Sequence, residues 1–232
     1  MDSCQFDIKF DQSLLSWDLA ICLKTKWPVH FNQQDYSGTW SSISLRSASG
    51  SETDIRATAN ARYQDTPLLD RCPYFRSVMD WFLCEKEAVR LLSLSPGSFI
   101  REHRDLSSGY EDGFFRIHVP IQTNDSVLFR VNGQELKMLP GSCWYANFNL
   151  PHFVSNDGGT DRIHLVIDCI RNSWSDELFR RAGYDFEKEG YVRYDRATKL
   201  AMISQLSAMN SETAARIVRQ LKDELAAEQD AL

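Results

Sequence analysis

The chain of 232 residues lacks any closely spaced pair of cysteines. Its six cysteines are scattered, and no two of them form a CxxC motif. A disulfide framework or a thiolate zinc site would normally show such spacing. The cysteines are therefore expected to be reduced thiols, which is typical of a cytoplasmic protein.

Long apolar runs and clusters of like charge are also missing. No stretch approaches the length of a membrane span, and the first residues lack the basic and apolar regions of a signal peptide. The formal net charge is -6 and no basic stripe is present, so neither a membrane nor a nucleic acid is expected as a partner. A hydrophobic content of 43% can build one core, which predicts one domain with or without an appendage.

Short strands separated by turn residues fill the middle of the chain. The pattern predicts strands over 88–94, 98–105, 114–121, 126–131, 134–138, 142–147 and 161–169. Asn132-Gly133 is typical of a two-residue hairpin, and Pro96-Gly97 and Pro140-Gly141 predict further turns. Many short strands at this spacing favour a sandwich or a jelly roll.

Helical patterns flank this region. Apolar residues at helical spacing predict a helix within 14–23 and another within 66–86, after Pro73. Three more helices are expected over 176–183, 195–208 and 211–228, the last with Ser211 as its N-cap. We therefore divide the chain into residues 1–174 and a C-terminal helical extension, 175–232. The extension either packs on the β core or serves as a dimerisation arm.

A candidate metal site follows the strand that ends near residue 103. His103 and Asp105 are two residues apart, so on a strand both side chains would lie on one face. His152 follows later, on a strand or turn. Two histidines and one carboxylate form the facial triad that holds non-heme Fe(II). Alternatively, His103 and Asp105 are a surface pair, because a His-x-Asp motif is short and common.

Two further strands carry charged residues among apolar ones. Along 114–121 the apolar side chains alternate, which leaves Arg116 and His118 together on the opposite face. Along 162–168 the same alternation separates Arg162, His164 and Asp168 from the apolar face. Polar side chains inside a β core are costly unless they are paired or bind something. With a metal nearby, these strands predict a cavity for an anionic ligand.

The same residues have structural interpretations. His118 and His164 also fit hydrogen-bonded histidines of a core. Arg162 also fits an ion pair with Asp161 or Asp168. The order of the motifs along the chain favours a common site over these separate roles.

That order resembles the aspartyl/asparaginyl β-hydroxylase family of Fe(II)/2-oxoglutarate-dependent oxygenases. The resemblance rests on the segments 103–105, 116–118, 141–145 with Pro151-His152, and 162–168. It is clearest over 88–170 and weaker over 38–42. Animal members lack the carboxylate ligand. Because this chain has Asp105, it resembles the small bacterial branch that includes proline cis-4-hydroxylase. The resemblance implies a mainly β, double-stranded β-helix core of the jelly-roll or cupin-like type.

The resemblance also implies roles for individual residues. His103, Asp105 and His152 would ligate Fe(II). Arg162 would pair with the distal carboxylate of the cosubstrate 2-oxoglutarate. His118 would lie near 2-oxoglutarate. O2 would be the second cosubstrate. The candidates for the substrate pocket are Arg116, Trp40 and Asn147.

We therefore expect an enzyme that hydroxylates an unactivated carbon of a small free amino acid, proline-like or other, and releases succinate and CO2. A residue in a peptide or on a carrier is the alternative substrate. Rivals of other classes are a zinc-binding, cupin-like hydrolase or isomerase and a non-catalytic sensor. Arg162 favours the oxygenase, because zinc hydrolysis needs no carboxylate clamp there. Halogenation is not expected, because a halide would need the metal-coordination position that Asp105 would fill. Besides the small-molecule substrate, a homodimer through the C-terminal helices is the partner that the sequence leaves open.

Overall fold

The computed structural model describes residues 1–58, 61–188, 194–208 and 212–230. The chain forms two compact units, Met1–Ile170 and Arg171–Leu232. The division lies near the boundary predicted after residue 174, and separate roles for the two parts stay a prediction. Within the described ranges, none of the helices is long and apolar enough to cross a membrane.

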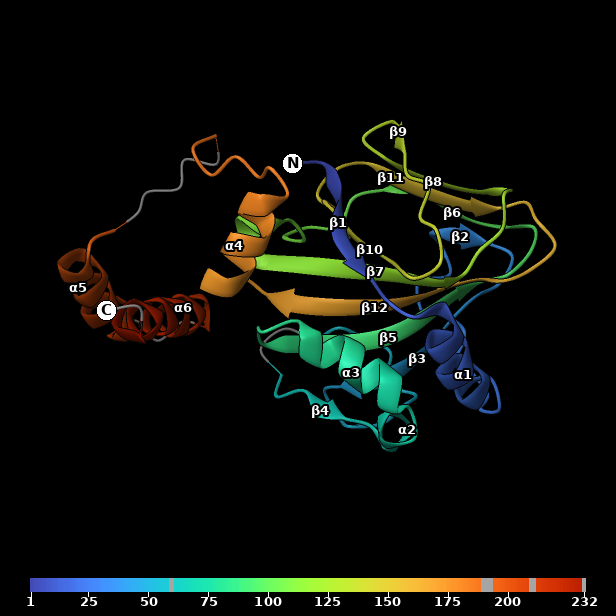
Figure 1. The fold of residues 1–232 in the computed structure, drawn as a ribbon, viewed down its shortest axis with the longest axis horizontal. Coiled ribbons are helices and arrows are strands. Elements are labelled where there is room, and N and C mark those ends of the chain that lie inside the picture. Colours follow the sequence, from blue (N-terminus) through green and yellow to red (C-terminus); the bar gives the residue numbers. More distant parts are fainter. Residues whose placement is uncertain (59–60, 189–193, 209–211, 231–232) are drawn as a thin grey trace. The chain divides into compact units, whose positions relative to one another are not determined.

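Two antiparallel sheets form the first unit (Figure 1). In spatial order the larger sheet contains β1 (Ser3–Lys9), β10 (Ser142–Ala146), β7 (Phe114–Gln122), β12 (Arg162–Ile170), β5 (Lys86–Leu94), β3 (Trp40–Ser47) and β4 (Gln64–Asp65). The smaller sheet contains β2 (Tyr36–Ser37), β6 (Ser98–His103), β11 (His152–Asn156), β8 (Val127–Val131) and β9 (Gln134–Glu135). Most sheet neighbours are distant in sequence, as in a jelly roll. This architecture confirms the fold class predicted from the sequence.

The hairpin between β8 and β9 turns as its sequence predicts. Asn132 and Gly133 have φ values of 49° and 77°, and a two-residue turn with both angles positive matches the twist of the flanking strands. The strand predicted over 134–138 is correct only for its first two residues. The N–H of Leu136 still donates to the carbonyl of Phe129 at 2.8 Å, and the side chains of Leu136 and Met138 join the core.

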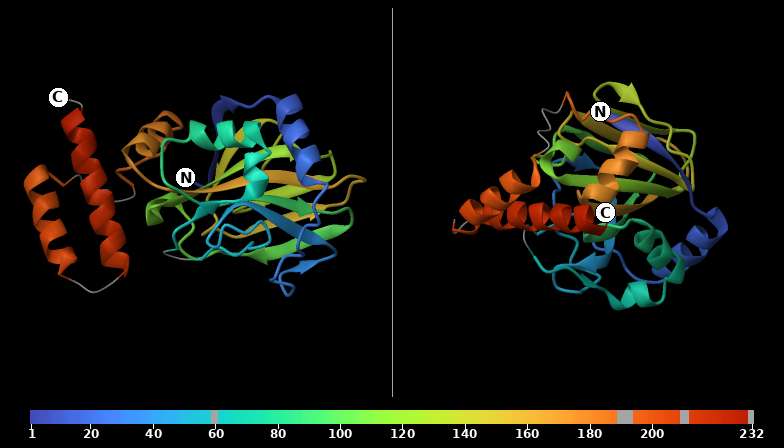
Figure 2. Two further views of the ribbon diagram at one scale, coloured as in Figure 1. Left: turned by 90° about the horizontal axis from the view of Figure 1, so that it is seen from below. Right: turned by 60° about the vertical axis from the view of Figure 1, so that its left-hand side comes forward.

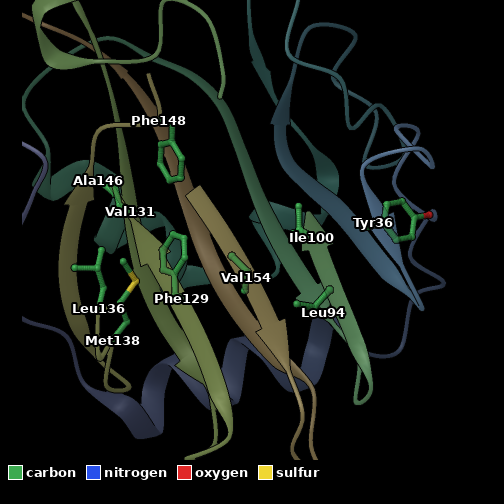
Figure 3. Packing of buried hydrophobic residues seen from close by; sticks show 10 residues of the cluster. All are labelled: Tyr36, Leu94, Ile100, Phe129, Val131, Leu136, Met138, Ala146, Phe148 and Val154. Atoms are coloured by element: carbon green, nitrogen blue, oxygen red, sulfur yellow. The ribbon is translucent and has the colours of Figure 1, made fainter. Parts of the chain in front are cut away.

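An apolar core lies between the smaller sheet and the larger one. Figure 3 shows its side chains, which come from both sheets and from the loops that join them. The cluster comprises Tyr36, Leu94, Ile100, Phe129, Val131, Leu136, Met138, Ala146, Phe148 and Val154. Phe129 and Phe148 stack with ring centroids 6.4 Å apart. This packing fixes the strands that carry the polar residues described below.

Three helices cover the face of the larger sheet that points away from the smaller one (Figures 1 and 2). They are α1 (Gln12–Cys22), α2 (Pro67–Asp70) and α3 (Pro73–Trp81). Buried Asp18 of α1 accepts hydrogen bonds of 2.8 Å from the backbone N–H groups of Tyr74 and Phe75, in the first turn of α3. A side chain of α1 thus caps α3, since the first N–H groups of a helix have no partner within it.

The second unit is helical, as the sequence predicts. It contains α4 (Ser173–Arg181), α5 (Arg196–Ser207) and α6 (Glu212–Asp230). Helices α5 and α6 contact each other, and Lys199 forms a largely buried ion pair of 2.8 Å with Glu224. The buried apolar residues of α6 recur at helical spacing: Ala214, Val218, Leu221 and Leu225. The predicted N-cap, Ser211, lies outside the described residues.

Candidate metal centre and its cavity

Three side chains with metal-ligand chemistry meet where β6 ends and β11 begins. His103 and His152 are directly paired across these strands, with ring centroids 4.1 Å apart. Asp105 lies just beyond β6, where its backbone N–H donates to the carbonyl of Phe148 at 2.9 Å. Its Oδ1 is 3.5 Å from Nε2 of His103. One ligand atom from each of the three residues lies within 4.8 Å of the other two, so a single ion fits between them.

Both imidazoles are held in the orientation that a metal needs. Nδ1 of His103 donates to the carbonyl of Arg101 at 2.8 Å, and Nδ1 of His152 donates to the carbonyl of Leu150 at 3.0 Å. Each Nδ1 therefore carries the proton, and each Nε2 keeps its lone pair for a metal. Burial lowers the pKa of His152 to about 4, so this ring is neutral at pH 7. The donor set is that of a facial triad with open positions.

A chain of charges extends from Asp105 into the larger sheet. Oδ2 of Asp105 lies 3.3 Å from Nη1 of Arg116. Nε and Nη2 of Arg116 donate to the two oxygens of Asp168 at 2.6 and 3.2 Å. Asp168 also accepts a hydrogen bond of 2.6 Å from Arg90. Arg116 thus orients Asp105, and the buried carboxylate of Asp168 in turn holds Arg116 in place.

The pKa values within this chain reflect its pairing. Burial alone would raise the pKa of Asp168, but Arg116 and Arg90 together hold it below its ordinary value. Burial opposes the charge of Arg116 as well, yet Asp168 and Asp105 raise its pKa above the ordinary range. Arg116 and Asp168 are therefore both charged at neutral pH, and removing either would leave a buried charge without compensation.

A cavity of about 510 Å³ opens beside the metal ligands. Its apolar wall comes from both sheets and includes Trp40, Leu92, Ile100, Phe129, Phe148 and Val154. Four of the chain's five histidines line the cavity. Arginines outnumber carboxylates in its lining, with Arg90, Arg104, Arg116 and Arg162 against Asp35 and Asp105. The space is therefore suited to small anions.

Arg162 is the cation of this lining that is both buried and without an acidic partner. Its side chain is 3% exposed, and no carboxylate in the described part of the chain forms a salt bridge with it. Nη2 donates to His164 at 3.0 Å, while Nε has no hydrogen-bond partner. Burial lowers the pKa of Arg162 to about 9, so the guanidinium still carries its charge at pH 7. The predicted pairing of Arg162 with Asp161 or Asp168 is absent from the described contacts, because Asp168 is held by Arg90 and Arg116.

The two remaining histidines adjoin this arginine. His164 takes the bond from Arg162, and its Nδ1 lies 3.4 Å from Nδ1 of His118. Nε2 of His118 is buried and has no partner, although the ring lines the cavity. Burial holds the pKa of His118 far below its ordinary value, so the ring is neutral. Arg162 and His118 both line the cavity, and each keeps an unsatisfied polar atom that a bound group could satisfy.

Two of the three residues predicted for the substrate pocket line the cavity. They are Arg116 and Trp40. Asn147 is placed elsewhere: its Nδ2 donates to Glu111 at 2.8 Å, and its Oδ1 accepts from the N–H of Asn149 at 3.0 Å. These bonds brace the loop around the short helix η1 (Tyr110–Asp112). The structure therefore gives Asn147 a supporting contact rather than a place in the wall.

Arg90 and His30 are among the cavity residues that the sequence did not predict. Arg90 interrupts the apolar run of β5 and lies on the same face as Leu92, which also lines the cavity. His30 lies in a loop before β2, where no periodic signal exists. Its ring stacks on Trp40 with centroids 3.5 Å apart and planes at 13°.

The fold and site define a jelly-roll protein in which two histidines and one carboxylate form a candidate metal centre beside a cavity that suits anions. The family model described as aspartyl/asparaginyl beta-hydroxylase matches residues 20–172, and the chain belongs to this family. The matched range contains the metal-ligand residues, Arg162 and the whole cavity lining. The family resemblance predicted from the sequence is confirmed, and with it the expectation of a hydroxylase fold.

Individual relatives agree with this assignment. The chain is 27% identical over 177 residues to L-proline cis-4-hydroxylase of Rhizobium meliloti (strain 1021), a match that covers 75% of this chain and 62% of the relative. The chain thus matches less than two thirds of that protein's length. Its fold is similar to that of an oxidoreductase of the 2OG-Fe(II) oxygenase family from Burkholderia pseudomallei. That match has a TM-score of 0.53 and 14% identity, and it covers 74% of this chain and 86% of the other.

Proposed function

We propose that this protein is a cytoplasmic Fe(II)/2-oxoglutarate-dependent oxygenase that hydroxylates a carbon atom of a small free amino acid. One observation carries the proposal: the metal-ligand triad and an uncompensated buried arginine, Arg162, line the same cavity. Membership of a hydroxylase family supports it. The chemistry requires a metal with open positions and an anchor for an anionic cosubstrate, and the cavity offers both.

The residues present fit iron. His103 and His152 would supply Nε2, and Asp105 would supply the oxygen that Arg116 does not hold. With 2-oxoglutarate and O2, bound iron supplies the oxidising power to hydroxylate an unactivated carbon, and succinate and CO2 are released. The protein's own contribution is to hold the target carbon close to the metal and to keep water away.

Arg162 is the proposed anchor of 2-oxoglutarate. A planar guanidinium matches a carboxylate with two parallel hydrogen bonds, and Nε of Arg162 is available for one of them. The apolar ring of Phe129 lies 5.4 Å from the guanidinium carbon and excludes water on that side. His118 would border the same molecule.

The substrate class follows from the charges that remain. After Arg162 is assigned to the cosubstrate, Arg104 and the two unused N–H groups of Arg116 are left for a second carboxylate. Asp35 is the cavity carboxylate that would face an ammonium group, and Trp40 offers an apolar wall. An amino acid carries all three features. The name of the Rhizobium relative, a proline hydroxylase, supports the same class.

Anaerobic titration of the protein with Fe(II) and 2-oxoglutarate tests the cofactors. We expect the weak visible charge-transfer band of the chelate, and a protein without that band would be the zinc enzyme or the sensor instead. Aerobic succinate release is then measured with the free proteinogenic amino acids, with non-proteinogenic ones and with N-acetylated amides that imitate a peptide. We expect a free amino acid to stimulate turnover and to gain one oxygen in mass. Stimulation by the amides alone would assign the substrate to a peptide or a carrier.

A further inference from the structure

We propose that His30 is a substrate-contacting residue, which donates a hydrogen bond from Nε2 to a carboxylate or carbonyl oxygen of the molecule that is hydroxylated. This inference rests on the proposed function and adds a specificity-determining side chain to its substrate site. It starts from a buried histidine that the metal centre does not use.

The backbone holds His30 in a fixed position, although the residue lies in a loop. Its N–H donates to the carbonyl of Trp40 at 2.8 Å, and the neighbouring Val29 forms a β-bridge with Ser41. The segment thus runs along β3 as an additional edge. The hydroxyl of Tyr36 donates to the carbonyl of His30 at 3.3 Å. The ring consequently has a defined place in the cavity wall.

Aromatic neighbours fix the plane of the ring. It stacks on Trp40 at 3.5 Å and on Phe31 at 4.4 Å, with planes at 13° and 26°. His30 is 8% exposed, and it belongs to the lining of the large cavity. The stack fixes the plane of the ring, and the contact from the backbone N–H of Asn32 to Nδ1 fixes which edge carries the nitrogen atoms.

The hydrogen-bonding pattern decides which nitrogen can donate. The backbone N–H of Asn32 points to Nδ1 of His30 at 3.4 Å. A peptide N–H can only donate, so Nδ1 must carry the lone pair and the proton must be on Nε2. Burial lowers the pKa of His30 to about 4, which keeps the ring in this neutral form at pH 7. Within the described ranges no acceptor is hydrogen-bonded to Nε2, which leaves one donor for a ligand.

The electrostatic neighbours of His30 indicate which ligand this is. Besides burial, the groups that shift its pKa include Arg90, Asp105, Arg116 and His103. They belong to the metal centre and its supporting charges, whereas the cosubstrate is assigned to Arg162. A donor stacked on Trp40, in the cavity that Arg116 also lines, adjoins the space proposed for the substrate. The expected partner is an oxygen atom that bears charge or partial charge.

Two substitutions separate this role from a purely structural one. His30→Phe keeps a flat ring on Trp40 and removes the donor, whereas His30→Gln restores an N–H group near the position of Nε2 and gives up the ring. Both are made in the full chain and assayed with Fe(II), 2-oxoglutarate and the same panel of amino acids and N-acetylated amides. Each variant is also titrated anaerobically, so that its chelate band shows whether the folded site is intact.

We expect His30→Phe to raise the Michaelis constant for the stimulating compound at least about tenfold, the loss typical of a hydrogen bond to a charged group. The Michaelis constant for the cosubstrate should stay within about twofold, and more succinate should form without hydroxylated product. His30→Gln should recover part of the apparent affinity for the stimulating compound.

Three results would contradict this expectation. Wild-type kinetics and coupling in His30→Phe would overturn the inference while the oxygenase assignment stands. Equal losses for the substrate and the cosubstrate would make His30 structural. A protein that forms the chelate but responds to no compound of the panel would overturn this inference together with the substrate class.

Discussion

His103 and His152 stand directly opposite each other on neighbouring antiparallel strands, although 48 residues separate them in the sequence. Because the side chains of such a pair lie on the same face, the sheet register alone brings the two rings together. Replacement of either histidine by alanine should therefore remove one of three protein ligands. Loss of a residue that only supports a metal ligand lowers metal affinity by up to about a hundredfold. We therefore expect loss of a ligand itself to lower Fe(II) affinity by at least about a hundredfold. Equilibrium dialysis with metal analysis measures it, and unchanged affinity in a folded variant would contradict the triad.

Arg162 provides the second prediction. Arg162→Ala should weaken 2-oxoglutarate binding by about 1.5–3 kcal/mol, because one charge-assisted pair is lost. Arg162→Lys should restore the charge but only part of the affinity, since an ammonium cannot form the planar fork. Titration of the anaerobic chelate band gives both values. If Arg162→Ala binds 2-oxoglutarate as tightly as the wild type, the anchor lies elsewhere, with Arg116 as the next candidate.

The buried charges around Asp168 should matter for stability as well as for the site. Asp168→Asn leaves Arg90 and Arg116 with no full negative charge between them, and we expect a loss of about 3–5 kcal/mol in unfolding free energy. Asp65→Asn is a matched control: Asp65 also contacts two arginines, Arg46 and Arg76, but at the surface. Its loss should be at most about 1 kcal/mol. Urea denaturation measures both, and equal losses would contradict the argument from burial.

The pH dependence of the wild type follows from the same carboxylate. Because the folded-state pKa of Asp168 lies below its ordinary value of 3.8, its stabilising contribution is fully present above that pH. It is lost as the pH falls through the lower folded-state value. Denaturation midpoints between pH 7 and 3 should therefore drop more steeply at the acid end for the wild type than for Asp168→Asn. Parallel curves would show that other carboxylates govern the acid limb.

Asp18 supplies a prediction that does not involve the site. Asp18→Ala removes the acceptor of two backbone N–H groups in the first turn of α3, and we expect a loss of about 1–3 kcal/mol. Asp18→Asn keeps one carbonyl oxygen and should lose less. Thermal unfolding ranks the two variants, and a smaller loss for alanine than for asparagine would contradict the capping role.

Alternation along strands explains how much of the site the sequence predicted. His103, Arg116 and Arg162 lie on strands, where every second residue points to the same face, and each lines the cavity as expected. The sequence placed His152 on a strand or a turn, and the structure makes it the first residue of strand β11. Periodicity within a strand therefore identified the side chains that a regular backbone directs.

Residues outside regular elements were harder to assign. His30 was missed because its position depends on a β-bridge to a distant strand and on stacking against Trp40. Asn147 was expected in the pocket, but it follows β10 at a bend where its amide meets Glu111. A loop has no period, so the direction of its side chains is set by tertiary contacts that a single sequence does not reveal.

The bonds from both ligand histidines to carbonyls of their own segments have a consequence for metal choice. Because Arg101 and Leu150 lock the rings before any ion arrives, the site is preorganised, and loading it requires no refolding. A rigid pair of imidazoles with one carboxylate also accepts cobalt, nickel or zinc, and affinity for divalent ions rises along the series from manganese to copper whatever the protein prefers. Selection of the proposed iron would thus depend on the supply of ions in the cell, and we expect protein purified on a nickel column to carry nickel.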